Sequence, residues 1–250
     1  INEVTQYPKT PQEALMVPSG GRFNVVKLRQ QLATVMRSPQ FRDKVRLGEI
    51  EWVYEGAKIV GAKWDDSPTG RYRMIEPPCV DEASKQVPPG LYVAGTDSYD
   101  IDQTVDFKGS FGSCHVFKQF NTFADTSRMF VCSLTERPAT SKEFYEDTLK
   151  LMVFYGHAKN LIEYSNKLIG EYYQQKGFAY LLKGRPEIYY QLKQNPGPQN
   201  QWGADTSVLP FAIQKLADYI ETDVEKIVDP YVLNKLIKYK TKAQLPAGAK

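Results

Sequence analysis

The chain has 250 residues, of which 42% are hydrophobic and 12% aromatic. This composition supports a folded domain with a sizeable core and excludes a disordered chain. The 32 basic and 29 acidic residues leave a formal net charge of +3, which neither requires nor excludes nucleic acid as a partner. No apolar run approaches the roughly 18 residues of a membrane-spanning helix, so we expect no membrane partner.

The chain contains three widely spaced cysteines, Cys79, Cys114 and Cys132. Their number and spacing exclude a disulfide-rich scaffold and a four-cysteine zinc site, and they fit a reducing compartment. The first residues, Ile-Asn-Glu, are not a basic stretch leading into an apolar run, so the sequence shows no signal peptide. Because the chain does not begin with Met, we expect it to be part of a longer protein.

Residues 1–90 predict one short helix and a small antiparallel sheet. Apolar residues of Asn24–Met36 recur at the spacing of one helix face. Stretches in which apolar and polar residues alternate, separated by turn residues, predict strands at Glu49–Tyr54, Ala57–Lys63 and Arg71–Ile75. We interpret residues 1–90 as a linker and a β extension packed on the domain that follows.

Residues 91–183 predict three strands, a helix, a strand, a second helix and a last strand. The expected strands are Leu91–Thr96, Phe111–Phe120, Met129–Thr135, Asn160–Ser165 and Phe178–Leu182. Thr140 and Glu143 have the spacing of a capping box at the start of the first helix, and the second covers Lys167–Gln175. Three sequential strands and two right-handed crossovers give an α/β fold, a mixed five-stranded sheet flanked by helices that fits the ribonuclease H-like class.

The rest of the chain predicts two further helices. One covers Pro210–Ile220, and the other begins after the cap Asp229 and Pro230. We expect these C-terminal helices to complete a domain that spans residues 91–250.

Two carboxylates stand where strands of the predicted core end. Asp97 follows the first strand, and Glu163 lies within the otherwise apolar strand after the first helix. In the ribonuclease H-like fold these strands are neighbours, about 4.8 Å apart. Because the two charges repel, a hard divalent cation such as Mg²⁺ or Mn²⁺ would stabilise the pair through oxygen ligands. Two such ions about 3.5–4 Å apart can activate a water and stabilise the leaving oxygen of a phosphodiester.

Each acid also has a purely structural interpretation. An Asp that ends a strand is often the first residue of a turn. Glu163 is a simple solvent-facing residue if its strand exposes one face, whereas a buried carboxylate needs a partner or an ion. A globular α/β binding domain without a metal site would hold the two side chains far apart.

Six segments, taken together in their order and spacing, carry a resemblance to a known family. They are Asn2–Ala14, Gly95–Asp100, Ser110–Phe117, Arg137–Tyr145, Leu161–Asn166 and Asp229–Tyr239. The second reads Gly-Thr-Asp-Ser-Tyr-Asp, and the fifth reads Leu-Ile-Glu-Tyr-Ser-Asn. On these segments, which cover most of the chain, it resembles the C-terminal nuclease domain of the large terminase subunit of tailed bacteriophages, the DNA-packaging motor.

The resemblance implies a metal-dependent endonuclease that cuts concatemeric viral DNA during genome packaging. It implies catalytic and metal-ligand roles for Asp97 and Glu163, accessory positions at Asn166 and Asp100, and two Mg²⁺ or Mn²⁺ ions. The implied partners are double-stranded DNA, the ATPase domain of the same parent protein, the portal and the small terminase subunit, in the cytoplasm of the host cell. Since the chain contains no G-x-x-x-x-G-K-[ST] motif, we expect it to have no ATPase activity.

The third acid of the family has no match at its usual place. It normally follows the late helix, but after Tyr239 this chain contains no acidic residue. The late aspartates that the chain does contain are Asp205, Asp218, Asp223 and Asp229. We interpret Asp229 as a helix cap and the others as surface charges.

Basic residues near the ends of core elements are candidates for contacts with DNA phosphates. Lys183 and Arg185 follow the last strand, and Lys167 begins the second helix. Such contacts would make DNA binding tolerant of sequence and sensitive to salt. Lys118 and Lys159 are further candidates, although an ordinary solvated role explains each of these side chains more simply.

Two other functions stay open from the sequence. Another ribonuclease H-like enzyme, such as a resolvase or integrase, would share the two acids but not the Tyr-Pro-x-Thr-Pro segment. A docking module of the packaging motor, inactive in isolation, would keep the fold with an incomplete catalytic site.

Overall fold

The computed structural model describes residues 23–99, 111–122, 124–163, 167–185, 187–192 and 208–239. The chain forms two compact units. One unit is Lys44–Leu209, and the other combines Ile1–Asp43 with Pro210–Lys250. The chain passes from one unit to the other near residues 43 and 209.

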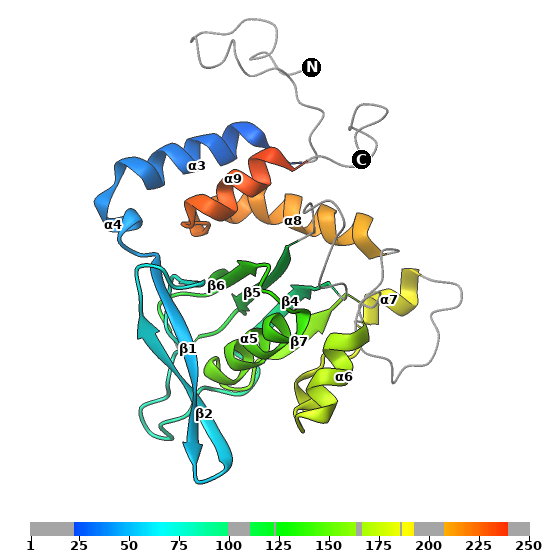
Figure 1. Ribbon diagram of the computed structural model, residues 1–250. Coiled ribbons are helices and arrows are strands. Elements are labelled where there is room, and N and C mark those ends of the chain that lie inside the picture. Colours follow the sequence, from blue (N-terminus) through cyan, green and yellow to red (C-terminus); the bar gives the residue numbers. More distant parts are fainter. Residues whose placement is uncertain are drawn as a thin grey trace, which may run out of the picture. The chain divides into compact units, whose positions relative to one another are not determined.

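The larger unit is built on one mixed sheet, whose described strands lie in the order β2-β1-β3-β6-β5-β4-β7 (Figure 1). Neighbouring strands are antiparallel, except that β4 and β7 are parallel. The strands are β1 (Arg46–Glu55), β2 (Lys58–Asp66), β3 (Tyr72–Met74), β4 (Tyr92–Asp97), β5 (Gly112–Lys118), β6 (Met129–Glu136) and β7 (Lys159–Ile162).

Four adjacent strands, β6-β5-β4-β7, have the order and directions of a ribonuclease H-like core. Strands β4, β5 and β6 form a meander, and helix α5 (Ser141–Phe154) then crosses over and brings β7 parallel to β4. The predicted fold class is therefore confirmed. The expected strand number was wrong: β3 pairs with β6 and joins the three strands of the β extension to the same sheet, whereas the expected fifth core strand does not form, so the described sheet has seven strands.

The prediction of a last core strand at Phe178–Leu182 was also wrong. Ala179–Leu181 forms a turn of 3₁₀ helix, and a single-residue parallel bridge joins Leu182 to Asn160 of β7. A short apolar run fits a strand and a buried helical turn equally well, so its pattern could not separate the two. The turn places Leu181 fully inside the core, directly after Gly177 ends helix α6 (Lys167–Gln175) with φ of +80°.

Helix α5 begins at the predicted cap. The Thr140 hydroxyl accepts a hydrogen bond from the Glu143 N–H at 3.3 Å and donates one to the Glu143 carboxylate at 3.1 Å. The helix packs against β1, β2 and α6, and it buries Phe144 and Leu149 completely (Figure 1). This packing anchors the crossover that sets β7 beside β4. A short helix that the sequence did not predict, α7 (Glu187–Leu192), follows later in the unit.

The smaller unit is helical. It contains α3 (Val25–Arg37), α4 (Pro39–Arg42), α8 (Leu209–Asp223), a 3₁₀ turn (Val224–Lys226) and α9 (Pro230–Lys238). Their apolar faces form a separate core that includes Leu28, Ile220 and Leu233. Three of these helices lie where the sequence predicts them. No helix in the described part of either unit has both the length and the apolar character needed to span a bilayer.

Candidate metal site

The two candidate acids lie side by side at one edge of the sheet. Asp97 is the last residue of β4, and Glu163 directly follows β7. The parallel register pairs Thr96 with Ile162, and the Glu163 N–H donates to the Thr96 carbonyl at 3.0 Å. The strand register therefore brings the next residue of each strand, Asp97 and Glu163, to the same level.

The carboxyl groups of Asp97 and Glu163 contact each other. The pKa of Asp97 rises to about 6, first because its carboxyl loses hydration and then because Glu163 hydrogen-bonds to it and adds a second negative charge. Asp97 as a whole residue is exposed and Glu163 is half-buried, so both can be reached from solvent. The structure thus differs from a binding domain in which these two side chains are far apart.

The other candidate residues fall into three groups. Asp100 and Asn166 lie outside the described residues, as does the side chain of Lys167, whose backbone begins α6. Lys183 is exposed, and its N–H donates to the Asn160 carbonyl at 2.8 Å. Arg185 is half-buried. The structure therefore places the two acids together and leaves the accessory roles as predictions.

The late aspartates in the described residues bond to neighbouring groups of the smaller unit. Asp229 caps α9, because its carboxylate accepts from the Tyr231 N–H at 2.8 Å. Asp223 forms an ion pair with Lys226 at 2.6 Å, and Asp218 accepts a hydrogen bond from Gln214 at 2.9 Å. Asp205 lies outside the described residues. Within the part of the chain that the structure describes, no group of three or more His, Cys, Asp or Glu side chains is arranged as a metal site.

Two of the basic candidates for DNA contacts have partners within the protein. Lys118 is 1% exposed, and its ammonium lies 2.5 Å from the Glu76 carboxylate and 2.9 Å from the Thr126 hydroxyl. The Lys159 ammonium donates to the carbonyl of Tyr180. Lys118 is therefore a buried structural cation and not a phosphate contact, since removing it from its partners would leave the Glu76 carboxylate without its cation.

Sequence reasoning missed a second group of acids that contacts Arg71. The Arg71 guanidinium bonds Glu49 of β1 at 2.8 Å and Glu136 of β6 at 3.3 Å, and it also contacts Asp147 of α5. Burial and the nearby charge of Asp147 raise the pKa of Glu136 to about 7, although Arg71 opposes that rise. Because Arg71 already bonds all three carboxylates, we assign this cluster to structure.

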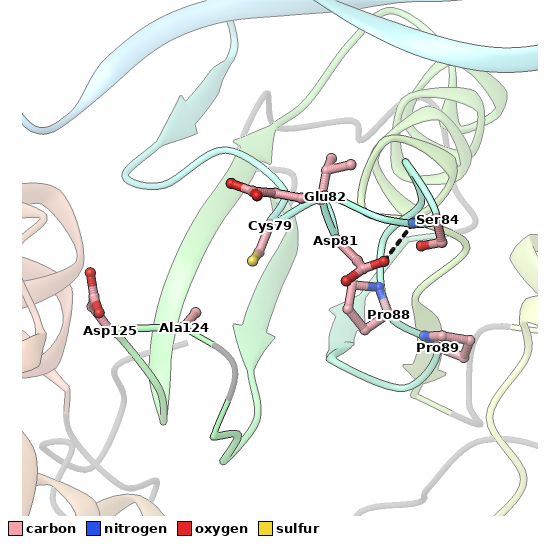
Figure 2. A pocket seen from close by; sticks show the side chains of 9 residues that line it. Cys79, Asp81, Glu82, Ser84, Pro88, Pro89, Ala124 and Asp125 are labelled. Atoms are coloured by element: carbon pink, nitrogen blue, oxygen red, sulfur yellow. Dashed lines mark hydrogen bonds between the residues drawn. The ribbon is translucent and has the colours of Figure 1, made fainter.

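A hollow of about 720 Å³ lies at the other end of the sheet from the two acids. Its walls come from the segment before β4, including Cys79, Pro88 and Pro89, and from the β5–β6 connection at Asp125. Figure 2 shows Asp81 in this wall, with its carboxylate accepting from the Ser84 N–H at 2.7 Å. The hollow is therefore separate from the Asp97 and Glu163 site, which lies at the opposite ends of the same strands.

Comparison with known proteins finds similarity among solved structures. The large terminase nuclease of thermophilic phage G20c is 17% identical, with 82% of this chain and 83% of that chain covered and a TM-score of 0.41. The same nuclease with bound magnesium is 16% identical, with 81% and 82% covered and a TM-score of 0.42. The large terminase nuclease domain of Thermus phage P74-26 is 18% identical, with 81% and 80% covered and a TM-score of 0.43.

No family model and no curated protein matches the chain. Because the TM-scores lie below 0.5, the fold assignment rests on the strand order of the sheet and not on these similarities. The chain is similar, among solved structures, to the nuclease domains of phage large terminases.

Proposed function

We propose that this chain is the nuclease part of a phage large terminase, a divalent-metal-dependent endonuclease that cuts concatemeric viral DNA during packaging. The observation that carries the proposal is the contact between the Asp97 and Glu163 carboxyl groups at the ends of two parallel neighbouring strands. In a ribonuclease H-like sheet, this arrangement combines hard oxygen donors with access from solvent. Both properties suit a site that must hold a cation and admit a DNA phosphate.

The donor set fits Mg²⁺ or Mn²⁺. Each of the two carboxylates supplies hard oxygen atoms, and their mutual repulsion disappears when a divalent charge lies between them. When bound, such an ion lowers the pKa of a water and stabilises negative charge on a phosphodiester. Asp97 and Glu163 would hold it, and their fixed positions on two strands would orient it against the DNA backbone.

We propose a second ion as well, with donors beyond this pair. Asn166 and Asp100 follow the two acids by three residues each in the sequence, and we propose them as accessory donors. Two ions would divide the work of activating water and stabilising the leaving oxygen.

The proposed substrate is double-stranded DNA, bound through its phosphates. Lys183, Arg185 and Lys167 all lie within a few residues of β7 or of the bridge at Leu182. Contacts from these side chains would position the backbone without reading the sequence. The ATPase domain of the parent protein, the portal and the small terminase subunit are the proposed partners in the motor, within the host cytoplasm.

Nicking of supercoiled plasmid tests this function. We expect nicking with Mn²⁺ or Mg²⁺, none with EDTA, and a loss of at least about 100-fold in Asp97→Asn and in Glu163→Gln. Asp125→Asn and Glu82→Gln are matched controls, since both are exposed acids on the hollow at the other end of the sheet. Activity that survived in both site variants would overturn the assignment of the site.

A further inference from the structure

Four buried polar side chains behind β4 and β7 form one continuous series of hydrogen bonds that ends on the backbone carbonyl of Tyr145. The Thr96 hydroxyl donates to Asn160 Oδ1 at 2.8 Å, and Asn160 Nδ2 donates to the Tyr173 hydroxyl at 3.3 Å. Tyr173 donates to the Thr148 hydroxyl at 3.0 Å, and Thr148 donates to the Tyr145 carbonyl at 2.8 Å. The series therefore joins both strands that carry the acids to helices α5 and α6.

The side chain of Tyr145 adds a separate hydrogen bond to the segment that directly follows β4. The Tyr145 hydroxyl donates to the carbonyl of Tyr99 at 2.8 Å. Tyr99 lies two residues after Asp97, and Thr96 lies immediately before it. Asp97 is thus bracketed by two side-chain hydrogen bonds, one on each side along the chain.

Burial makes each of these links costly to break. Asn160, Thr148 and Tyr173 are completely buried, and Tyr145 is 1% exposed. Each hydroxyl in the middle of the series donates one bond and accepts another, so removing a link leaves a buried polar group without its partner. The strand ends are therefore held in one arrangement through several side chains and not through the sheet alone.

The faces of the strands explain how this network can act on the site without touching it. Successive side chains of a strand point to opposite faces, so Thr96 points into the core while Asp97 does not. Asn160 and Ile162 are likewise buried on β7, and Glu163 follows them at the edge. The network therefore binds the buried face of each strand: Thr96 lies one residue before Asp97, and Asn160 lies three residues before Glu163.

We propose that this network, Thr96–Asn160–Tyr173–Thr148–Tyr145, consists of positioning residues that set the separation of the Asp97 and Glu163 carboxylates for a divalent cation. The inference rests on the proposed function of that site. Residues behind metal ligands that orient them typically change metal affinity by about 10-fold or more when they are removed. The network should therefore control cation affinity in addition to stability.

The test compares buried hydroxyl deletions at the two ends of the sheet. Tyr145→Phe and Thr96→Val each remove one hydrogen bond, Tyr173→Phe removes two, and all three keep the approximate shape of the side chain. Tyr155→Phe is the matched control, because Tyr155 is also 1% exposed and donates to a backbone carbonyl, that of Glu76, at 2.6 Å. The Tyr155 hydroxyl also contacts the carbonyl of Val131. Val131 lies near the start of β6, whereas the site lies at the other end of that strand, near Glu136.

Calorimetric titration of the whole chain with Mn²⁺ gives a readout that stability alone does not move. We expect the three network variants to bind Mn²⁺ about 10-fold more weakly than wild type, with Tyr155→Phe within 2-fold of wild type. Wild-type affinity in all three folded network variants would overturn the positioning role and leave the proposed function standing. A wild-type protein that bound no Mn²⁺ would overturn the proposed function, and the positioning role with it.

Discussion

The carboxyl groups of Asp97 and Glu163 lie next to each other across the parallel pair β4 and β7, where burial and then the proximity of Glu163 raise the pKa of Asp97 to about 6. At mildly acidic pH Asp97 therefore carries a proton. Near neutral pH the proton is lost and two negative charges face each other. A divalent cation can take the place of that proton. Metal binding would therefore relieve the repulsion between the two carboxylates.

Removing one charge of the pair should stabilise the metal-free protein. At pH 7.5, above the pKa of about 6, the folded state disfavours the charged form of Asp97. We therefore expect Asp97→Asn to unfold at a higher temperature than wild type in EDTA, while Asp125→Asn unfolds at the wild-type temperature. A clearly lower melting temperature for Asp97→Asn would show that its charge stabilises the fold, against the repulsion described here.

Adding Mn²⁺ should reverse this order. A ligand at about 100 times its dissociation constant stabilises the folded state by about 2.7 kcal/mol, and only protein that keeps the site benefits. Wild type and Asp125→Asn should therefore gain thermal stability with Mn²⁺, whereas Asp97→Asn and Glu163→Gln should not. Equal gains in all four proteins would place the bound metal elsewhere.

The cluster around Arg71 predicts a pH dependence of stability. The pKa of Glu136 is about 7 in the folded protein, against 4.5 as its ordinary value, because of burial and the nearby charge of Asp147. The folded state then binds more protons than the unfolded state between these values, so this contribution is present below about pH 4.5 and is lost as pH rises through about 7. Glu136→Gln has no carboxyl group to ionise, so it does not lose stability in this way as pH rises.

Urea unfolding of wild type and Glu136→Gln at pH 4.5, 6 and 8 measures the effect. We expect the free energy of unfolding of the variant, relative to wild type, to increase from pH 4.5 to pH 8. A difference that stayed constant across the three pH values would mean that Glu136 has the same pKa in the folded and unfolded protein.

Gly112 occupies a position that excludes any side chain. A Cβ atom on this residue would lie 2.6 Å from the ring of Phe144, which is fully buried on α5. We expect Gly112→Ala to cost about 1–3 kcal/mol in unfolding free energy, since overpacking forces the ring or the strand to move. Gly61→Ala on β2, where a Cβ would have no neighbour within 4 Å, is the control and should change stability by less than about 0.5 kcal/mol.

The contrast between two lysines tests the proposed DNA contacts. Lys183 is exposed, whereas Lys118 is buried against Glu76. If Lys183 neutralises one phosphate, Lys183→Gln should weaken binding of unrelated DNA sequences alike and reduce the slope of log affinity against log salt by about 0.9. An unchanged slope in filter-binding measurements would remove Lys183 from the interface.

Several features of the fold could be predicted because local chemistry determines them. Thr140 and Glu143 mark the start of α5, and the segment Lys167–Gln175 carries a helical pattern that ends before Gly177. The order of strands and helices then leaves few topologies, and the ribonuclease H-like core follows. The run Phe178–Leu182 was misassigned because five apolar residues contain no period that separates a strand from a helical turn.

The pairing of Asp97 with Glu163 followed from topology, but the network behind it did not. Thr96 and Asn160 are 64 residues apart, and Arg71 and Asp147 are 76 apart, so no local pattern joins them. One signal was present: Asn160 is a polar residue at the start of an apolar strand, as Glu163 is near its end. A polar side chain among buried apolar neighbours needs a partner, and this reasoning applies to Asn160 as well as to Glu163.

The most direct test of the site is a crystal of this chain grown or soaked with Mn²⁺ and measured for anomalous scattering. Our account predicts an anomalous peak between the carboxylates of Asp97 and Glu163, which disappears in Asp97→Asn. An anomalous peak elsewhere on the chain, with none between these two carboxylates, would contradict it.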